Sequence, residues 1–234
     1  MIIMISPAKT FKVHPLSRNQ EPYFLSDAKS LHAKLSKLSI KMITKQMKVS
    51  DRLAESIYDQ YQHFGENKNA AIFSYFGHQY KHIDALSLMP LYESSLSNLY
   101  ILSGLYGLLN AFDDISPYRL EMQDKSIGNL YHFWKPKLTD YIHDKFNQEV
   151  IYNLCSDEYG SLIKHLDQTI TIEFYQLKHE KLSIHSMEVK KMRGLFARHM
   201  IMNPDQDVKT INIDGYHFDP LKSNNQTYIF IKEV

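Results

Sequence analysis

Three serine residues of this sequence stand directly after short apolar segments, at the points where predicted β-strands end. They are Ser6, Ser103 and Ser156. In open α/β sheets, ligands bind beyond the carboxyl ends of the strands, where backbone N–H groups point outward. If these strands are parallel neighbours, their three loops meet at one crevice. The alternative is that each serine belongs to an ordinary turn, in which serine is common.

The loop after the first of these strands combines two hydroxyl groups with a cation. Ser6, Lys9 and Thr10 fall within five residues, and such groups suit a phosphate oxygen. The loop is not a P-loop, because the glycines are missing and Pro7 removes one N–H donor. A surface lysine in a turn is the alternative interpretation.

The loop after the third of them carries two adjacent carboxylates. Asp157 and Glu158 lie between Ser156 and Tyr159. Adjacent carboxylates in a partly buried site can have different pKa values, so that one acts as an acid and the other as a base. A carboxylate in the first turn of a helix is also favoured by the helix dipole. Both interpretations remain open at this point.

Arg119 and Glu121 form a third group of polar residues. In an extended segment, residues two apart point to the same side of the chain. The arginine can therefore clamp an anionic ligand, or it can form an ion pair with Glu121.

The segment 188–199 is the clearest cationic element, and its apolar residues recur at helical spacing. Its cations are Lys190, Lys191, Arg193 and Arg198. Gly194 lies between them and allows a backbone or a ligand to come close. Several cations within about two helical turns suit phosphate contacts, although a solvated helix face can carry similar charge.

The segment 102–111 loosely resembles the turn of a helix-hairpin-helix element. Such turns offer glycine N–H groups to a DNA phosphate without reading the bases. Its candidate anion-binding residues are Ser103, Gly104, Tyr106 and Gly107. Tyr106 or Tyr159 is also suited to hold a base that has been flipped out of a duplex.

Regular elements must hold these residues in place. Apolar runs predict strands at 2–5, 70–76, 99–102, 150–155, 169–174, 182–185, 208–213 and 227–232. Helical spacing predicts helices at 26–38, 50–64, 86–94, 130–146 and 187–202. With no repeat and no linker-like tract, the pattern predicts an α/β (mixed α+β) fold in a single domain, residues 1–234, with a mixed sheet flanked by helices.

Composition excludes several classes of protein. The 234 residues carry a formal net charge of +1, so any phosphate-binding charge must lie in a local patch. Cys155 is the single cysteine, which excludes an intramolecular disulfide and a Cys-rich zinc site. We expect no metal site and no cofactor. With no signal-like segment and no apolar run of membrane-spanning length, we expect a cytoplasmic monomer with no membrane partner.

Seven short motifs, in this order, resemble the YaaA family of peroxide stress proteins. They are ISPAKT (5–10), LSGLYG (102–107), PYRLEM (117–122), LYHFW (130–134), NLCSDEY (153–159), KKMRGLFARH (190–199) and GYHFD (215–219). The resemblance implies a compact α/β fold with a cationic cleft and a helix-hairpin-helix element that binds double-stranded DNA. It also implies a role in the response to hydrogen peroxide, limiting free intracellular iron and oxidative damage to DNA.

Two segments depart from the family pattern. Phe76-Gly77-His78 replaces a glycine flanked by a lysine and an acid, and Asn110-Ala111 replaces Arg-Pro. With two cations fewer near the expected cleft, we predict weaker DNA binding or a shallower salt dependence.

Two classes of function fit these residues. The first is a DNA-binding protein of peroxide defence. The second is an enzyme that acts on a nucleotide, or on a nucleobase in nucleic acid, by N-glycosidic or related chemistry. In it Asp157 or Glu158 would be the acid or base, and Lys9 and Arg119 would hold the anion. Direct iron binding is less favoured, because adjacent ligands such as Asp157 and Glu158 chelate poorly.

Overall fold

The structure is a computed structural model that describes residues 1–12 and 16–234. Within these residues the main sheet has the strand order β11-β12-β9-β8-β1-β5-β6, and β10 pairs with β9. Five strands are mutually parallel: β1 (Ile2–Ile5), β5 (Leu99–Ser103), β8 (Ile151–Leu154), β9 (Thr169–Lys178) and β12 (Thr227–Glu233). Three run antiparallel to their neighbours: β6 (Gly107–Asn110), β10 (Lys181–Ser183) and β11 (His217–Phe218). The predicted α/β fold with a mixed sheet is confirmed.

The centre of the sheet is the trio β8-β1-β5, whose carboxyl ends lie side by side as predicted. Ile5 pairs with Ile101 on one side and with Leu154 on the other. All four residues of β1 are buried, as expected for a central parallel strand covered on both faces. The chain leaves β1 for β5 on one side and returns to β8 on the other. The boundary between β1 and β8 is therefore the topological switch point, where open α/β sheets bind ligands.

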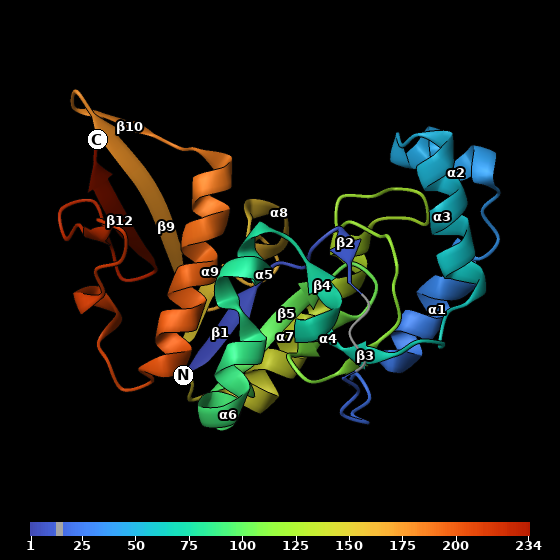
Figure 1. Cartoon of the computed structure of the whole chain (residues 1–234), viewed down its shortest axis with the longest axis horizontal. Coiled ribbons are helices and arrows are strands. Elements are labelled where there is room, and N and C mark those ends of the chain that lie inside the picture. The colour runs from blue at the N-terminus through green and yellow to red at the C-terminus, as the bar shows by residue number, and fades with distance from the viewer. Residues whose placement is uncertain (13–15) are drawn as a thin grey trace.

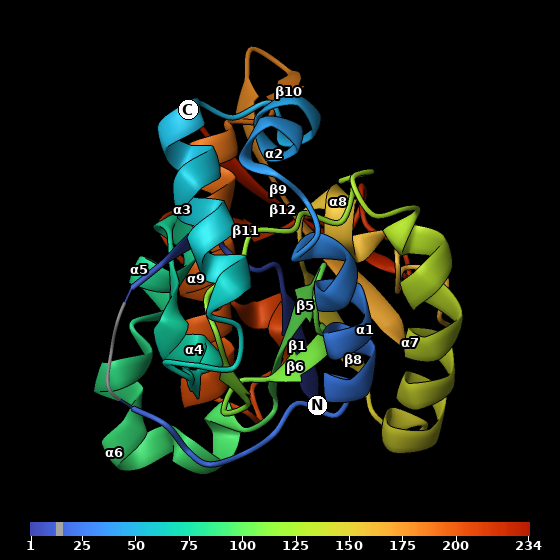
Figure 2. The ribbon, with the colours of Figure 1, turned by 90° about the vertical axis from the view of Figure 1, so that its right-hand side faces the viewer.

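Helices cover both faces of the sheet. Figure 2 shows α5 (His78–Ile83), α6 (Ala85–Leu96) and α9 (Ser186–Met202) on one side of the strands and α7 (Leu130–Phe146) on the other. Right-handed crossovers that run in opposite directions from a central strand place their helices on opposite faces in this way. In Figure 1, α1 (Leu25–Leu35), α2 (Ile40–Met47) and α3 (Asp51–Gln62) form one end of the molecule. No helix in the described part of the chain combines the length and hydrophobicity that a membrane span requires.

Two predicted strands are wrong. The run 70–76 contains the end of β3 (Asn69–Ala70), one buried turn of helix α4 (Ala71–Ser74) and β4 (Tyr75–Phe76). A continuous apolar run does not distinguish a buried strand from a buried helical turn. The segment 208–213 begins with the 3₁₀ helix η1 (Val208–Thr210), whose start is capped by Asp207. The short elements β2 (Thr10–Phe11), β7 (Asp114–Ile115) and α8 (Asp157–Gly160) complete the fold.

The helix hairpin predicted at 102–111 is wrong in its position, because that segment joins the antiparallel strands β5 and β6. A helix pair with a short connection occurs instead at α2 and α3. The oxygen of Ser39 accepts from the N–H of Met42 at the start of α2, and that of Ser50 accepts from Leu53 at the start of α3. Lys48 ends α2 in the left-handed conformation, with φ of 52°.

Candidate functional site

A cavity of about 470 Å³ lies at the carboxyl ends of β1 and β8. Its walls come from five parts of the chain: residues 6–10, 76–80 and 118–121, the loop after β8 without Asp157, and helix α9. Ten of the polar residues singled out in the sequence line it: Ser6, Lys9, Thr10, Arg119, Glu121, Ser156, Glu158, Tyr159, Lys190 and Arg193. We call this cavity the switch-point pocket.

Direct hydrogen bonds join the loops that follow β1 and β8. Ser6 Oγ accepts from the N–H of Ser156 at 2.8 Å, and the two serine hydroxyl oxygens lie 3.2 Å apart. The hydroxyl of Tyr80, on α5, donates to the backbone oxygen of Ser6 at 2.9 Å. These bonds fix the floor of the pocket and attach it to α5, one of the helices that cover one face of the sheet.

The third serine lies below this floor. Ser103 is fully buried, and its Oγ lies 2.7 Å from the hydroxyl of Tyr118, which in turn lies 2.7 Å from that of Tyr75. Tyr118 lines the pocket, so the β5 end reaches the site only through this tyrosine.

The glycine turn after β5 is a packing feature of the core. A Cβ on Gly104 would lie 2.4 Å from the backbone oxygen of Leu120, and one on Gly107 would lie 2.5 Å from the ring of Trp134. The indole N–H of Trp134 donates to the Gly104 oxygen at 2.8 Å. Tyr106 is buried too, and its N–H donates to Ser103 Oγ at 2.9 Å. This turn therefore lies outside the pocket lining.

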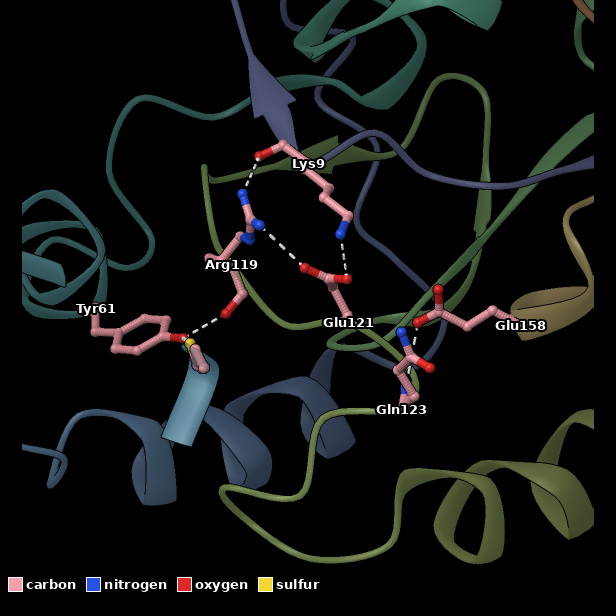
Figure 3. A network of polar contacts seen from close by, with 7 residues as sticks. Lys9, Tyr61, Arg119, Glu121, Gln123 and Glu158 are labelled. Atoms are coloured by element: carbon pink, nitrogen blue, oxygen red, sulfur yellow. Dashed lines mark hydrogen bonds and ion pairs between the residues drawn. The ribbon is translucent and has the colours of Figure 1, made fainter. Parts of the chain in front are cut away.

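Glu121 forms ion pairs with two of the cations that line the pocket, Lys9 and Arg119 (Figure 3). Its carboxylate lies 2.5 Å from Lys9 Nζ and 3.0 Å from Arg119 Nη2. The ion-pair alternative for Arg119 is thus the observed one. The backbone oxygen of Arg119 accepts from the hydroxyl of Tyr61, which connects the pocket wall to helix α3. With one carboxylate shared by two cations, this group keeps a charge of +1.

The two adjacent carboxylates face different cavities. Glu158 lines the switch-point pocket, and one of its oxygens accepts from the N–H of Gln123 at 3.2 Å. Burial raises the pKa of Glu158, and the nearby Glu121 adds to the effect, while the Gln123 N–H and Lys9 oppose it. Asp157 is exposed and lines a second cavity of about 330 Å³. The two carboxylates are therefore not placed to exchange a proton with each other.

Helix α9 contributes two of its four cations to the pocket. Lys191 forms an ion pair with Asp214 at 2.5 Å, and Arg198 donates to the backbone oxygen of Ile83 at 2.8 Å. Lys190 and Arg193 line the pocket instead, and neither has a carboxylate within ion-pair distance in the described part of the chain.

Gly194 sets the spacing between α9 and α5. A Cβ at this position would lie 2.3 Å from the backbone oxygen of Gln79. The close approach predicted for this glycine is thus made by the backbone of α5. It brings Gln79 and Arg193 to the same pocket wall.

Two nitrogen atoms of this wall have no hydrogen-bond partner among the described residues. They are Nε2 of Gln79 and Nε of Arg193, and both atoms are buried. Burial also lowers the pKa of Arg193, and the nearby Cys155, Asp157 and Glu173 oppose that effect. A buried donor without an acceptor costs roughly 1–3 kcal/mol, so both atoms are available to donate to a ligand in the pocket.

The mouth of the pocket contains an aromatic side chain that sequence reasoning missed. Phe76 is 37% exposed, and its ring centroid lies 6.0 Å from Lys12 Nζ and 4.8 Å from Lys81 Nζ. The β2–β4 ladder positions it by pairing Phe76 with Thr10. The sequence signal for this residue was the departure at Phe76-Gly77-His78.

The second departure from the family pattern, Asn110-Ala111, lies away from the pocket. Asn110 donates its side-chain N–H to the backbone oxygen of Ser97 at 2.6 Å, and Ala111 is buried at the end of β6. Neither residue lines the pocket, so the cation missing there does not reduce its charge.

One histidine pair was also overlooked. His78 and His82 stand four residues apart on α5, a spacing that can serve a metal. Nδ1 of His82 lies 2.7 Å from the backbone oxygen of His78, and no group of three His, Cys, Asp or Glu side chains in residues 1–12 and 16–234 is arranged to hold a metal. Burial lowers the pKa of His78, and His82, Lys81 and Lys190 lower it further.

The chain is similar over most or all of its length to proteins of a known family. A family model described as "Peroxide stress protein YaaA" matches residues 1–222. A UPF0246 protein of Finegoldia magna is 36% identical to this chain, with 100% of this chain and 99% of that protein covered. UPF0246 proteins of Crocosphaera subtropica and Clostridioides difficile are each 34% identical, with at least 99% of both chains covered. Every residue that lines the pocket falls inside the matched region.

Proposed function

This chain belongs to the YaaA family of peroxide stress proteins, and we propose that it serves the cellular response to hydrogen peroxide by binding double-stranded DNA. We further propose that it thereby limits oxidative damage to DNA and restrains free intracellular iron, and that it acts as a cytoplasmic monomer. The first of these proposals has a structural argument, which follows.

The observation that carries it is a cluster of three exposed lysines at the mouth of the pocket. Lys12, Lys81 and Lys190, here called the rim lysines, have no carboxylate partner among the described residues. Two of them contact the ring of Phe76, and Lys81 and Lys190 both lower the pKa of His78. In a chain of net charge +1, such a group is the local positive patch that phosphate binding requires.

The α2–α3 pair supplies a second surface for the same duplex. It carries Lys41, Lys45, Lys48 and Arg52, all exposed. In Figure 1 these helices lie at the same upper side of the molecule as α8, which borders the pocket. We assign the helix-hairpin-helix element of the family to α2 and α3, with the backbone after Lys48 directed to a DNA phosphate.

A filter-binding series over salt concentration tests the proposal. Replacing Lys12 and Lys81 by alanine should weaken duplex binding and reduce the slope of log affinity against log salt by about 0.9 for each lost phosphate contact. The matched control removes two exposed lysines of α7, Lys135 and Lys145, on the other face of the sheet. Equal effects of the two pairs would contradict a local binding surface.

The iron proposal has its own test. Cells whose only copy of the protein lacks the rim lysines should accumulate free iron after peroxide exposure, as measured by electron paramagnetic resonance of chelated iron. Normal iron in such cells, together with lost DNA binding in vitro, would separate iron control from DNA contact.

A second candidate function is favoured by Glu158. Its carboxyl group faces the pocket, and burial raises its pKa, which is how general acids are tuned in enzymes. The reaction would act on a nucleotide or nucleobase held in the pocket. Glu158→Gln should abolish base release from nucleotides or DNA, while Asp157→Asn, in the other cavity, should retain it. No product from the native protein with any nucleotide or nucleic acid would contradict this candidate.

A further inference from the structure

We propose that the switch-point pocket binds a free nucleoside 5′-monophosphate, with its phosphate against Gln79, Lys190 and Arg193 and its sugar and base toward Phe76 and Glu158. The proposal deepens the second candidate function, on which it depends for the class of ligand, and it does not require duplex binding. It identifies a binding site and leaves the chemical step open.

The phosphate end is argued from donors that lack acceptors. Nε2 of Gln79 and Nε of Arg193 are buried without a partner in the described residues, and Gln79 is only 8% exposed. Lys190 lies on the same face of α9, three residues before Arg193, and no carboxylate in residues 1–12 and 16–234 pairs with it. The Gln79 amide and the cations Lys190 and Arg193, which share one wall, are the kinds of group that bind a phosphate dianion.

The carboxylates Glu121 and Glu158, which also line the pocket, can only accept hydrogen bonds when they are ionised, so the ligand must supply the donors. Glu121 already shares its oxygens between Lys9 and Arg119, whereas Glu158 accepts from backbone N–H groups, including that of Gln123 at 3.2 Å, and forms no ion pair among the described residues. A carboxylate has about four acceptor sites, so Glu158 can also accept from a sugar hydroxyl or from an amino group on a base. A bare inorganic anion would leave these acceptor sites unused, which favours a ligand with phosphate at one end and hydroxyl or amino groups at the other.

An aromatic ring is available for the base. Phe76 is partly exposed at the mouth of the pocket, and the side-chain nitrogens of Lys12 and Lys81 lie near its ring. Bases stack on such rings without regard to sequence.

The size of the cavity selects a single nucleotide. About 470 Å³ falls in the range of roughly 300–1,000 Å³ that small-molecule pockets occupy. A duplex cannot enter it, because the major groove alone is about 12 Å wide. The pocket therefore has room for one nucleotide unit, and the body of a duplex lies outside on the rim.

The experiment is isothermal titration of the full chain with AMP, GMP, CMP and UMP, and with adenosine, ribose 5-phosphate and inorganic phosphate as partial ligands. At least one monophosphate should bind, and its nucleoside should bind about tenfold or more weakly, since a charge-assisted contact is lost. Binding of adenosine as tightly as AMP, or binding of none of the monophosphates, would overturn the proposal. Phosphate or ribose 5-phosphate binding as tightly as every nucleotide would overturn the assignment of the base.

Matched variants separate the residues involved. Lys190→Ala and Arg193→Met should each weaken nucleotide binding about tenfold or more, whereas Lys191→Ala and Arg198→Met should leave it unchanged. Lys190 is exposed, so its replacement is compatible with folding even if the Arg193 variant is not. Equal losses within the pair Lys190 and Lys191 would contradict the site.

The two functions can fail separately. Lys12→Ala with Lys81→Ala is expected to weaken duplex binding, and Arg193→Met is expected to weaken nucleotide binding while sparing the duplex. A protein that binds duplex but no nucleotide refutes this inference alone. A protein that binds nucleotide but no duplex refutes the DNA proposal alone.

Discussion

Ser6 and Ser156 are separated by 150 positions in the chain, yet Ser6 Oγ accepts the backbone N–H of Ser156 at 2.8 Å. This bond forms because β1 and β8 are parallel neighbours whose ends coincide. It ties together the two loops that flank the switch point of the sheet. The floor of the pocket therefore forms because the strand order places β1 beside β8.

Removing that acceptor should cost stability. Ser6→Ala leaves the Ser156 N–H without its partner, so we expect the free energy of unfolding in urea to fall by about 1–3 kcal/mol. Ser156→Ala removes only the 3.2 Å hydroxyl contact and should cost less. Equal losses of unfolding free energy in the two variants would show that the bond from the Ser156 N–H to Ser6 Oγ contributes nothing beyond the hydroxyl contact.

The two arginines of α9 should respond to the same substitution in opposite ways. Arg193→Met removes a guanidinium whose buried Nε has no acceptor in the described part of the chain, so stability should be unchanged or increased. Arg198→Met removes donors to the Ile83 oxygen and to Ser87 Oγ, both at 2.8 Å, and should cost about 1–3 kcal/mol. Thermal unfolding and urea unfolding measure the stability change in each of the two variants. A large loss in the Arg193 variant alone would mean that its guanidinium is structural.

Gly194→Ala tests the contact between α5 and α9. Alanine is favoured over glycine in a helix by about 1 kcal/mol, so propensity alone predicts stabilisation. The added methyl would instead lie 2.3 Å from the Gln79 oxygen, and we expect a net loss of about 1–3 kcal/mol. A stabilised variant in urea unfolding would mean that the helices separate without cost.

Glu158 should give the protein a specific pH dependence. Its pKa is raised in the folded state, so the native protein holds this proton more tightly than the unfolded chain does. The contribution of Glu158 to stability is therefore present below the ordinary value of 4.5 and is lost as pH rises through the raised pKa. Glu158→Gln should remove that decline, measured as urea unfolding of both proteins from acid to neutral pH. Parallel pH profiles would contradict a raised pKa.

Much of the site follows from short-range sequence patterns. An Ile-rich run that ends at Ser6 identifies a buried strand and its loop, and the spacing of Arg119 and Glu121 places both side chains on one side. The same rules placed Lys190 and Arg193 on a cationic helix. These features depend on neighbours within a few residues, which is the range over which side-chain periodicity operates.

The choice between neighbouring residues could not be predicted in this way. Glu158 faces the pocket and Asp157 does not, because successive residues of a helical turn point in different directions. Lys191 is held by Asp214, a partner 23 residues away, while Lys190 forms no ion pair with any residue that the structure describes. Such outcomes depend on tertiary contacts that no local pattern contains.

The glycine turn after β5 illustrates the same limit. Its sequence matches a phosphate-binding turn, yet Gly107 is required because the Trp134 ring lies where its Cβ would be. A glycine that allows close packing and one that allows close approach of a ligand look identical in sequence.

Duplex binding by Lys190→Ala and Lys191→Ala, measured side by side across a salt series, tests the central claim most directly. The two variants lose the same charge at adjacent positions, one on the pocket rim and one paired with Asp214. We predict weaker binding and a salt slope smaller by about 0.9 for Lys190→Ala, with Lys191→Ala close to the native protein. Equal binding by both variants, or a larger loss for Lys191→Ala, would contradict the assignment of function to the rim of the switch-point pocket.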